Sequence, residues 1–117
     1  MAITLYGIHN CDTVKKARVW LTDNGIEHTF HDFKKGGVTR SMLDAWLDEI
    51  PWETLLNRRG TSWRALPEER RNAVRNADNA IALMLENPSL IKRPVLALDD
   101  GVYCGYSEKQ YRDLFQC

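Results

Sequence analysis

Residues 2–21, AITLYGIHNCDTVKKARVWL, change their pattern at the cysteine. Up to residue 8, β-branched and aromatic residues run over the length of a short buried strand. From Asp12 onward, apolar residues recur at helical spacing and basic residues occupy the opposite face. The sequence therefore predicts a strand, a tight connection and an amphipathic helix that stops near residues 23–25, DNG.

The position of Cys11 at the helix entrance changes the chemistry of its thiol. The first turn of a helix leaves backbone N–H groups without partners, and the helix dipole adds about half a positive charge there. For a cysteine in such a place, the pKa falls from about 8.5 into a range of roughly 3.5 to 7.5. Because the thiolate is the nucleophile, Cys11 is the candidate catalytic residue. The alternative is that Cys11 merely fills a crowded loop, and the neighbouring Asp12 would favour the neutral thiol unless it caps the helix.

The next elements predict an α/β fold. Residues 26–33, IEHTFHDF, alternate in polarity and predict a second strand, parallel to the first and joined to it by a right-handed crossover. Helical spacing then dominates residues 39–49, 52–57 and 78–86. Pro67, followed by two acids, marks another helix start, with the proline at the first helical position. The middle of the chain is therefore predicted to be helical.

Residues 93–107, RPVLALDDGVYCGYS, predict a hairpin with an Asp-Gly turn, and Ser107 is the predicted N-cap of a closing helix. The order βαβ, helices, ββα indicates an α/β sandwich around a mixed four-stranded sheet, with an inserted helical region. The predicted organisation is one domain, 1–117, with its core at 1–35 and 90–117 and the helical insertion at about 38–88.

Composition excludes several classes of function. The 117 residues carry no net charge, so a nucleic acid partner is not expected. No apolar run is long enough for a membrane span, and the start lacks a signal-peptide pattern, so a cytoplasmic protein with no membrane partner is expected. Three widely spaced cysteines do not form a disulfide scaffold. A metal cluster of His9, Cys11 and His31 lacks paired ligand spacing, so neither a metal nor a bound cofactor is expected.

Pro94, in the stretch IKRPV, starts the first strand of the predicted hairpin, where its missing N–H is tolerated. In thiol folds with this order of elements, such a proline is expected to be cis, so that the preceding backbone faces the thiol and pairs with an extended peptide ligand. Arg93 would then lie near Cys11. The alternative is an ordinary surface arginine.

Four stretches, YGIHNCDTVKKARVWL, LLNRRGTSWRAL, ENPSLIKRPVL and YCGYS, resemble the arsenate reductase and Spx family of thioredoxin-like proteins. The resemblance covers nearly the whole chain and is greatest to a bacterial branch proposed to contain glutathione-dependent thiol reductases. It implies a thioredoxin-like core with an inserted helical region. It also implies that Cys11 is the catalytic cysteine and that Arg93 binds the substrate oxyanion.

The chain departs from the family pattern at three positions. Two further arginines surround the anion in family arsenate reductases, but here the matching positions hold Asn57, next to Arg58, and Gly105. These replacements argue against arsenate reduction. Spx-like regulators often carry C-x-x-C, whereas this chain has Val14 at the fourth position, so a redox switch within this motif is excluded.

A single nucleophilic cysteine needs a second thiol to release its adduct, and glutathione is the expected co-substrate in a cytoplasm. Its carboxylates are predicted to meet Arg93 and Arg58, and its peptide to pair beside Pro94. Asn10, next to the cysteine, is grouped with these substrate-binding residues. The predicted function is therefore a glutathione-dependent thiol reductase that acts on a small thiol-linked or oxyanion substrate.

The alternative function is an Spx-like regulatory module that contacts RNA polymerase or another protein, with vestigial chemistry. Six of the ten arginines lie within residues 58–75 and form either a partner-facing patch or a solvated helical face. Of the four tryptophans, Trp63 is the candidate to line a cleft. Cys104 is expected to be a buried small residue, and Cys117 is a weaker candidate to release the adduct on Cys11.

Overall fold

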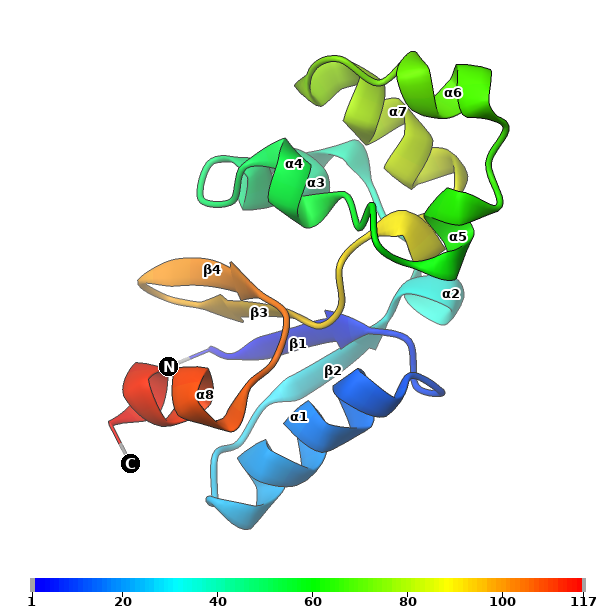
Figure 1. Ribbon diagram of the computed structural model, residues 1–117. Helices are drawn as coiled ribbons and strands as arrows, with labels where there is room; N and C mark the ends of the chain where they lie inside the picture. The colour runs from blue at the N-terminus through cyan, green and yellow to red at the C-terminus, as the bar shows by residue number, and fades with distance from the viewer. Residues whose placement is uncertain (1, 117) are drawn as a thin grey trace. The chain divides into compact units, whose positions relative to one another are not determined.

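The structure is a computed structural model that describes residues 2–116 (Figure 1). The chain divides into two compact units. The first comprises the residues up to Gly36 and those from Arg93 onward, and the second comprises Gly37–Lys92. Within the described part of the chain, no helix has the length and apolar character that crossing a membrane requires.

A mixed four-stranded sheet forms the centre of the first unit. Strand β1 (Thr4–Gly7) pairs in parallel with β2 (Thr29–Asp32) and antiparallel with β3 (Val95–Leu98). Strand β3 forms a hairpin with β4 (Gly101–Cys104), which gives the spatial order β2-β1-β3-β4. The predicted α/β class, with its βαβ…ββα core and mixed sheet, is confirmed.

Two helices cover one face of this sheet, α1 (Asp12–Asp23) and α8 (Glu108–Phe115) (Figure 1). The buried cluster between them and the sheet joins Leu5 of β1, Leu96 of β3 and Tyr111 of α8 with the apolar side of α1. The rings of Trp20 and Tyr111 meet edge to face with centroids 5.6 Å apart. The apolar spacing of both helices therefore serves one core, which fixes α1 against the strands.

The start of α1 lies directly against β1 because Gly7 has no side chain. A Cβ atom at Gly7 would come within 2.7 Å of Val14 Cγ2, so only a glycine permits this approach. Val14 is fully buried by the contact. The first turn of α1, and with it the residue that precedes the helix, is thus held close to the end of β1.

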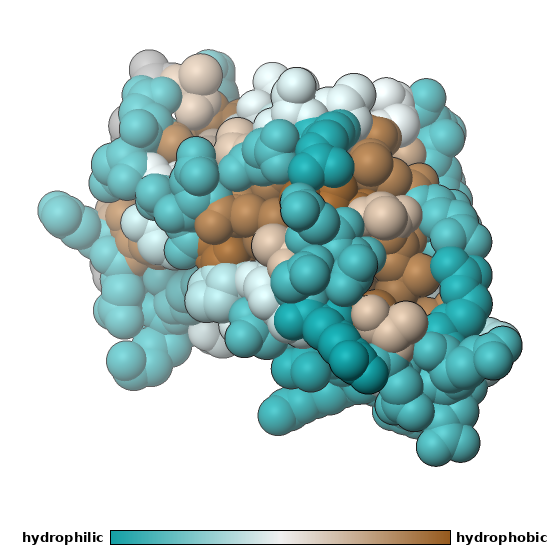
Figure 2. Space-filling view, turned by 90° about the horizontal axis from the view of Figure 1, so that it is seen from above, coloured by the Kyte–Doolittle hydropathy of each residue, from teal (hydrophilic) through white to brown (hydrophobic). Residues whose placement is uncertain are grey.

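The second unit consists of short helices. The longest are α3 (Arg40–Leu47) and α7 (Ala77–Glu86), whose first N–H groups are capped by the side chains of Thr39 and Asn76. Arg40 pairs with Asp78 at 3.0 Å, which joins these two helices at the surface. The other elements are α4 (Trp52–Leu55), α5 (Thr61–Arg64), α6 (Glu68–Asn72) and the 3-10 helix η1 (Pro88–Leu90). The face shown in Figure 2 is largely hydrophilic, with apolar side chains visible in patches between the polar ones.

Several boundaries differ from the predicted ones. The second strand is shorter than residues 26–33, because Phe33 begins the helical turn α2 (Phe33–Gly36). The predicted Asp-Gly turn is wrong by one residue: Leu98 pairs with Gly101, so Asp99 and Asp100 form the loop. In the second unit, Pro67 precedes its helix as the N-cap rather than occupying the first helical position.

Candidate active site

Cys11 lies in the connection between β1 and α1. Its N–H donates to the carbonyl of Ile8 at 3.2 Å, which closes a turn over His9 and Asn10. Cys11 has extended backbone angles and is the N-cap of α1, and its carbonyl accepts the N–H of Lys15 at 2.9 Å. The side chain is partly exposed. The thiol therefore stands at the helix entrance and remains accessible to a reactant.

The surroundings of Cys11 favour the thiolate. Burial by itself raises the pKa of the thiol, but the backbone N–H of Val14, a hydrogen bond and positive charge from Arg93, and the N–H of Thr13 lower it. The net result is a pKa below the ordinary value. Backbone N–H groups of the first helical turn and a guanidinium thus surround the same sulfur, which is the arrangement that activates a cysteine nucleophile.

Arg93 and Pro94 reach this site from the other half of the first unit. Arg93 is partly buried, and the Arg93–Pro94 peptide bond is cis, as predicted. The carbonyl of Pro94 accepts the N–H of Gly105 at 2.9 Å, just beyond the end of β4. Gly105 is buried and has φ of +80°, a conformation that an arginine adopts only with strain. The structure brings Cys11 and Arg93 together, and their catalytic roles remain predictions.

Two further predicted binding residues, Asn10 and Arg58, belong to different units of the chain. Asn10 is exposed in the turn before Cys11. Arg58 belongs to the second unit, where its guanidinium lies over the ring of Trp52, 5.7 Å from the centroid. Arg58 also lines a pocket of about 580 Å³ in that unit. The pocket wall carries three cations, one carboxylate and one indole ring: Arg58, Arg59, Lys92, Glu53 and Trp63.

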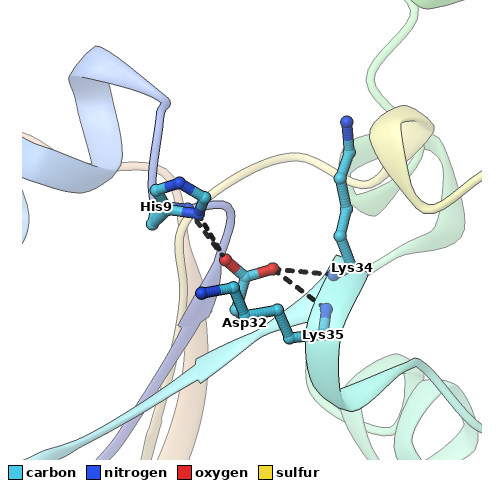
Figure 3. Close-up of polar contacts among 4 residues, drawn as sticks. All are labelled: His9, Asp32, Lys34 and Lys35. Atoms are coloured by element: carbon cyan, nitrogen blue, oxygen red, sulfur yellow. Dashed lines mark hydrogen bonds and ion pairs between the residues drawn. The ribbon is translucent and has the colours of Figure 1, made fainter.

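A buried carboxylate beside the cysteine loop is the part of the site that sequence reasoning missed. Asp32, at the end of β2, accepts hydrogen bonds from the N–H and Nδ1 of His9 at 3.2 and 2.9 Å (Figure 3). It also accepts the N–H groups of Lys34 and Lys35 at 2.8 and 3.3 Å. Burial tends to raise the pKa of Asp32, but these donors outweigh burial and lower the pKa to about 2. A charged residue at the end of a strand that continues directly into a helical turn was the available signal.

The remaining predicted residues fall outside this cluster. Cys104 ends β4 and is partly exposed rather than fully buried, and it forms no disulfide with Cys11. Cys117 lies outside the described residues. Across residues 2–116, no three His, Cys, Asp or Glu side chains gather as metal ligands would, and this includes His9, Cys11 and His31.

Comparison with known proteins places these features in a family. The family model described as the ArsC family matches residues 6–114. The solved structure of an arsenate reductase related protein from Brucella melitensis is 51% identical, with a TM-score of 0.79, and the match covers 100% of this chain and 97% of that one. The solved structure of a protein called YFFB is 44% identical, with a TM-score of 0.90, and covers 96% and 97% of the two chains. The global transcriptional regulator Spx of Streptococcus pyogenes is 24% identical over 94% of this chain and 82% of its own length.

Proposed function

The chain belongs to the ArsC family, and we propose that it is a thiol reductase with Cys11 as the nucleophile and glutathione as the co-substrate. One observation carries this proposal: the Cys11 sulfur receives the N–H groups of Val14 and Thr13 together with the guanidinium of Arg93. A thiolate held in this way at a partly exposed position can attack a sulfur atom brought to it.

The reaction takes place in two exchanges. In the first, the Cys11 thiolate attacks one sulfur of a disulfide, a new S–S bond forms to Cys11, and the second sulfur leaves with the electron pair of the broken bond. In the second, the thiolate of glutathione attacks this mixed disulfide and releases the Cys11 thiolate. In sum, one glutathione thiol is consumed, one thiol is released from the substrate, and the other half of the substrate ends in a disulfide with glutathione, so the enzyme returns unchanged.

Arg93 and Arg58 are the proposed anion-binding residues. Arg93 already donates to the sulfur of Cys11, so an anionic group of the substrate that approaches this sulfur would meet the same guanidinium. Arg58 contributes to a pocket with three cations and one carboxylate, which suits the carboxylates of glutathione. Asn10 and Pro94 flank Cys11 and Arg93 in sequence, and we assign them to the backbone and side-chain contacts of the bound peptide.

Thiol-linked substrates take precedence over arsenate in this proposal. Gly105 has a backbone conformation that disfavours an arginine, and Asn57 supplies an amide where a second guanidinium would stand. Of the three arginine positions that surround the anion in family arsenate reductases, only the one at Arg93 holds an arginine here, although Arg58 follows Asn57 directly. We place the enzyme in the cytoplasm, where glutathione supplies the second exchange.

The decisive experiment is incubation with oxidised glutathione, followed by intact mass measurement and peptide mapping. We expect one glutathione adduct, on Cys11, which subsequent addition of reduced glutathione removes. Cys11→Ser should abolish the adduct, whereas the matched variant Cys104→Ser should retain it. An adduct that persists in Cys11→Ser, or no adduct on the wild-type protein, contradicts the proposed function.

The similarity to Spx favours a second candidate, a protein-binding regulatory module. The arginines of residues 58–75 would form its contact patch, but some of them already bind other groups of the chain. Arg70 pairs with both carboxylate oxygens of Glu86 at 3.0 and 2.6 Å. Arg71 donates to the carbonyl of Arg64 at 3.3 Å. Binding to purified RNA polymerase that survives Cys11→Ser but is lost in Arg71→Glu would favour the module over the enzyme.

A further inference from the structure

In each exchange at Cys11 a sulfur atom gains or loses a proton, and His9 is a titratable residue two positions before Cys11. His9 and Cys11 are two residues apart on the turn that the N–H of Cys11 closes onto Ile8. Two residues of chain span at most about 7 Å between Cα atoms, so His9 and Cys11 lie at the same end of the sheet. The His9 side chain is 59% exposed, so its ring is accessible from solvent.

Asp32 determines which ring nitrogen of His9 faces a reactant. An ionised carboxylate only accepts hydrogen bonds, so Nδ1 of His9 donates to Asp32 across 2.9 Å and Nε2 is left as the nitrogen that gains and loses a proton. Nε2 has no hydrogen-bond partner among residues 2–116. The carboxylate is itself held by the N–H groups of His9, Lys34 and Lys35 and is only 8% exposed (Figure 3). A fixed, buried carboxylate behind an accessible imidazole is the arrangement that orients a histidine for proton transfer.

We propose that His9 gives a proton to the sulfur that leaves in the first exchange and takes one from the thiol that enters in the second, with Asp32 as its positioning residue. This inference rests on the proposed thiol reductase function. When the Cys11 thiolate attacks a disulfide, the departing thiolate takes the proton from Nε2 and becomes a thiol. The neutral imidazole then accepts the proton of glutathione, whose thiolate releases Cys11, and His9 is charged again.

The charges around His9 are consistent with this cycle. Asp32 at the end of β2 contacts the ring, Lys34 and Lys35 follow it on α2, and Asp12 begins α1. The hydrogen bond to Asp32 fixes Nδ1 as the donating nitrogen, which leaves Nε2 for proton exchange. The carboxylate stays ionised throughout because four donors hold it in that form.

The benefit of a proton donor depends on the leaving sulfur. A sulfur whose thiol is strongly acidic leaves well as a bare thiolate, whereas an alkyl thiolate leaves poorly and gains from protonation. The test therefore compares two carboxylate-bearing disulfides with different leaving groups, an aromatic one, 5,5′-dithiobis(2-nitrobenzoate), and an alkyl one, oxidised glutathione. Their shared negative charge means that simple attraction to a cationic ring affects both in the same direction.

The measurement is the single-turnover rate of mixed-disulfide formation on Cys11 with each disulfide, for wild type, His9→Gln and the matched control His28→Gln. His28 lies just before β2, at the opposite end of this strand from Asp32, and its Nδ1 contacts the carbonyl of Ile26 at 3.0 Å. We expect His9→Gln to slow the alkyl disulfide at least tenfold and to change the aromatic disulfide less than twofold. Asp32→Asn, if it folds, should reproduce the selective loss.

Equal slowing of both disulfides by His9→Gln would show that the ring only shapes the loop and would overturn the proposal. An unchanged alkyl rate would overturn it as well. Failure of the wild-type protein to react with either disulfide would instead overturn the thiol reductase function, and with it this inference. Iodoacetamide alkylation of Cys11, which needs no proton donor, reports in the same variants whether the thiol itself has changed.

Discussion

At the scale of single residues, the Arg93 side chain acts together with the backbone N–H of Val14 to lower the pKa of the Cys11 thiol against the effect of burial. Removing its hydrogen bond and charge in Arg93→Met should raise the pKa of Cys11 and slow iodoacetamide alkylation at pH 6 severalfold, because less thiolate is present. The midpoint of the alkylation rate against pH measures the change directly. Arg93→Lys keeps the charge, so its midpoint should lie between those of wild type and Arg93→Met. If the midpoint of Arg93→Met equals that of wild type, Arg93 does not act on the Cys11 thiol.

A second prediction at this scale concerns Tyr111, whose hydroxyl is fully buried without a hydrogen-bond partner. Burial also raises the pKa of Tyr111, so the hydroxyl stays neutral. Tyr111→Phe should raise the free energy of unfolding by up to about 1–2 kcal/mol, because it removes an unsatisfied polar group and keeps the ring contacts. Urea unfolding measures this, with the partly exposed Tyr106→Phe as the control, and a loss of stability would indicate a partner for the hydroxyl.

At the scale of elements, Asp32 connects the end of β2, the cysteine loop and α2. Its pKa is about 2 in the folded protein, against an ordinary value of 3.8. A carboxyl whose pKa is lowered by folding stabilises the protein above its unfolded pKa, and this contribution is lost as the pH falls through about 4 to 2. Asp32→Asn should therefore be less stable at pH 7 and should lose less stability than wild type between pH 4 and 2.

Unfolding free energies in urea at pH 7, 4 and 2.5 check this prediction. Asp23→Asn, at the exposed end of α1, is the matched control and should keep the wild-type acid dependence. If Asp32→Asn also keeps it, the hydrogen bonds of Figure 3 do not stabilise the carboxylate in solution.

The same scale shows why the sequence predicted some parts of this fold and not others. The strand, helix and hairpin patterns are local, so the sheet, α1 and the place of Cys11 followed from residue spacing. The pairing of His9 with Asp32 joins residues 23 positions apart and depends on the parallel register that sets Gly7 opposite Asp32. The spacing of apolar residues does not reveal which residues of two strands lie opposite each other. This is also why the predicted hairpin loop differs by one residue from the observed one, in which Leu98 pairs with Gly101.

At the scale of the whole molecule, Arg58 belongs to the second compact unit, whereas Cys11 and Arg93 belong to the first. If Arg58 binds a carboxylate of glutathione, Arg58→Gln should raise the KM for glutathione about tenfold or less, as expected for one charge-assisted hydrogen bond at an exposed residue. It should leave the pH dependence of Cys11 alkylation unchanged. Arg75→Gln, in the same unit, is the control, and an unchanged KM in Arg58→Gln would assign its pocket to another ligand.

Because Val14 packs directly against the backbone of Gly7, the position of the first turn of α1 and the reactivity of the Cys11 thiol depend on different interactions. A contact between hydrocarbon and backbone is not weakened by the screening of charges, so it continues to hold the first turn of α1 against β1 when salt is added. The attraction to the Arg93 guanidinium at a partly exposed site is weakened by added salt. Concentrated salt should therefore lower the reactivity of the Cys11 thiol, whereas the fold should remain intact.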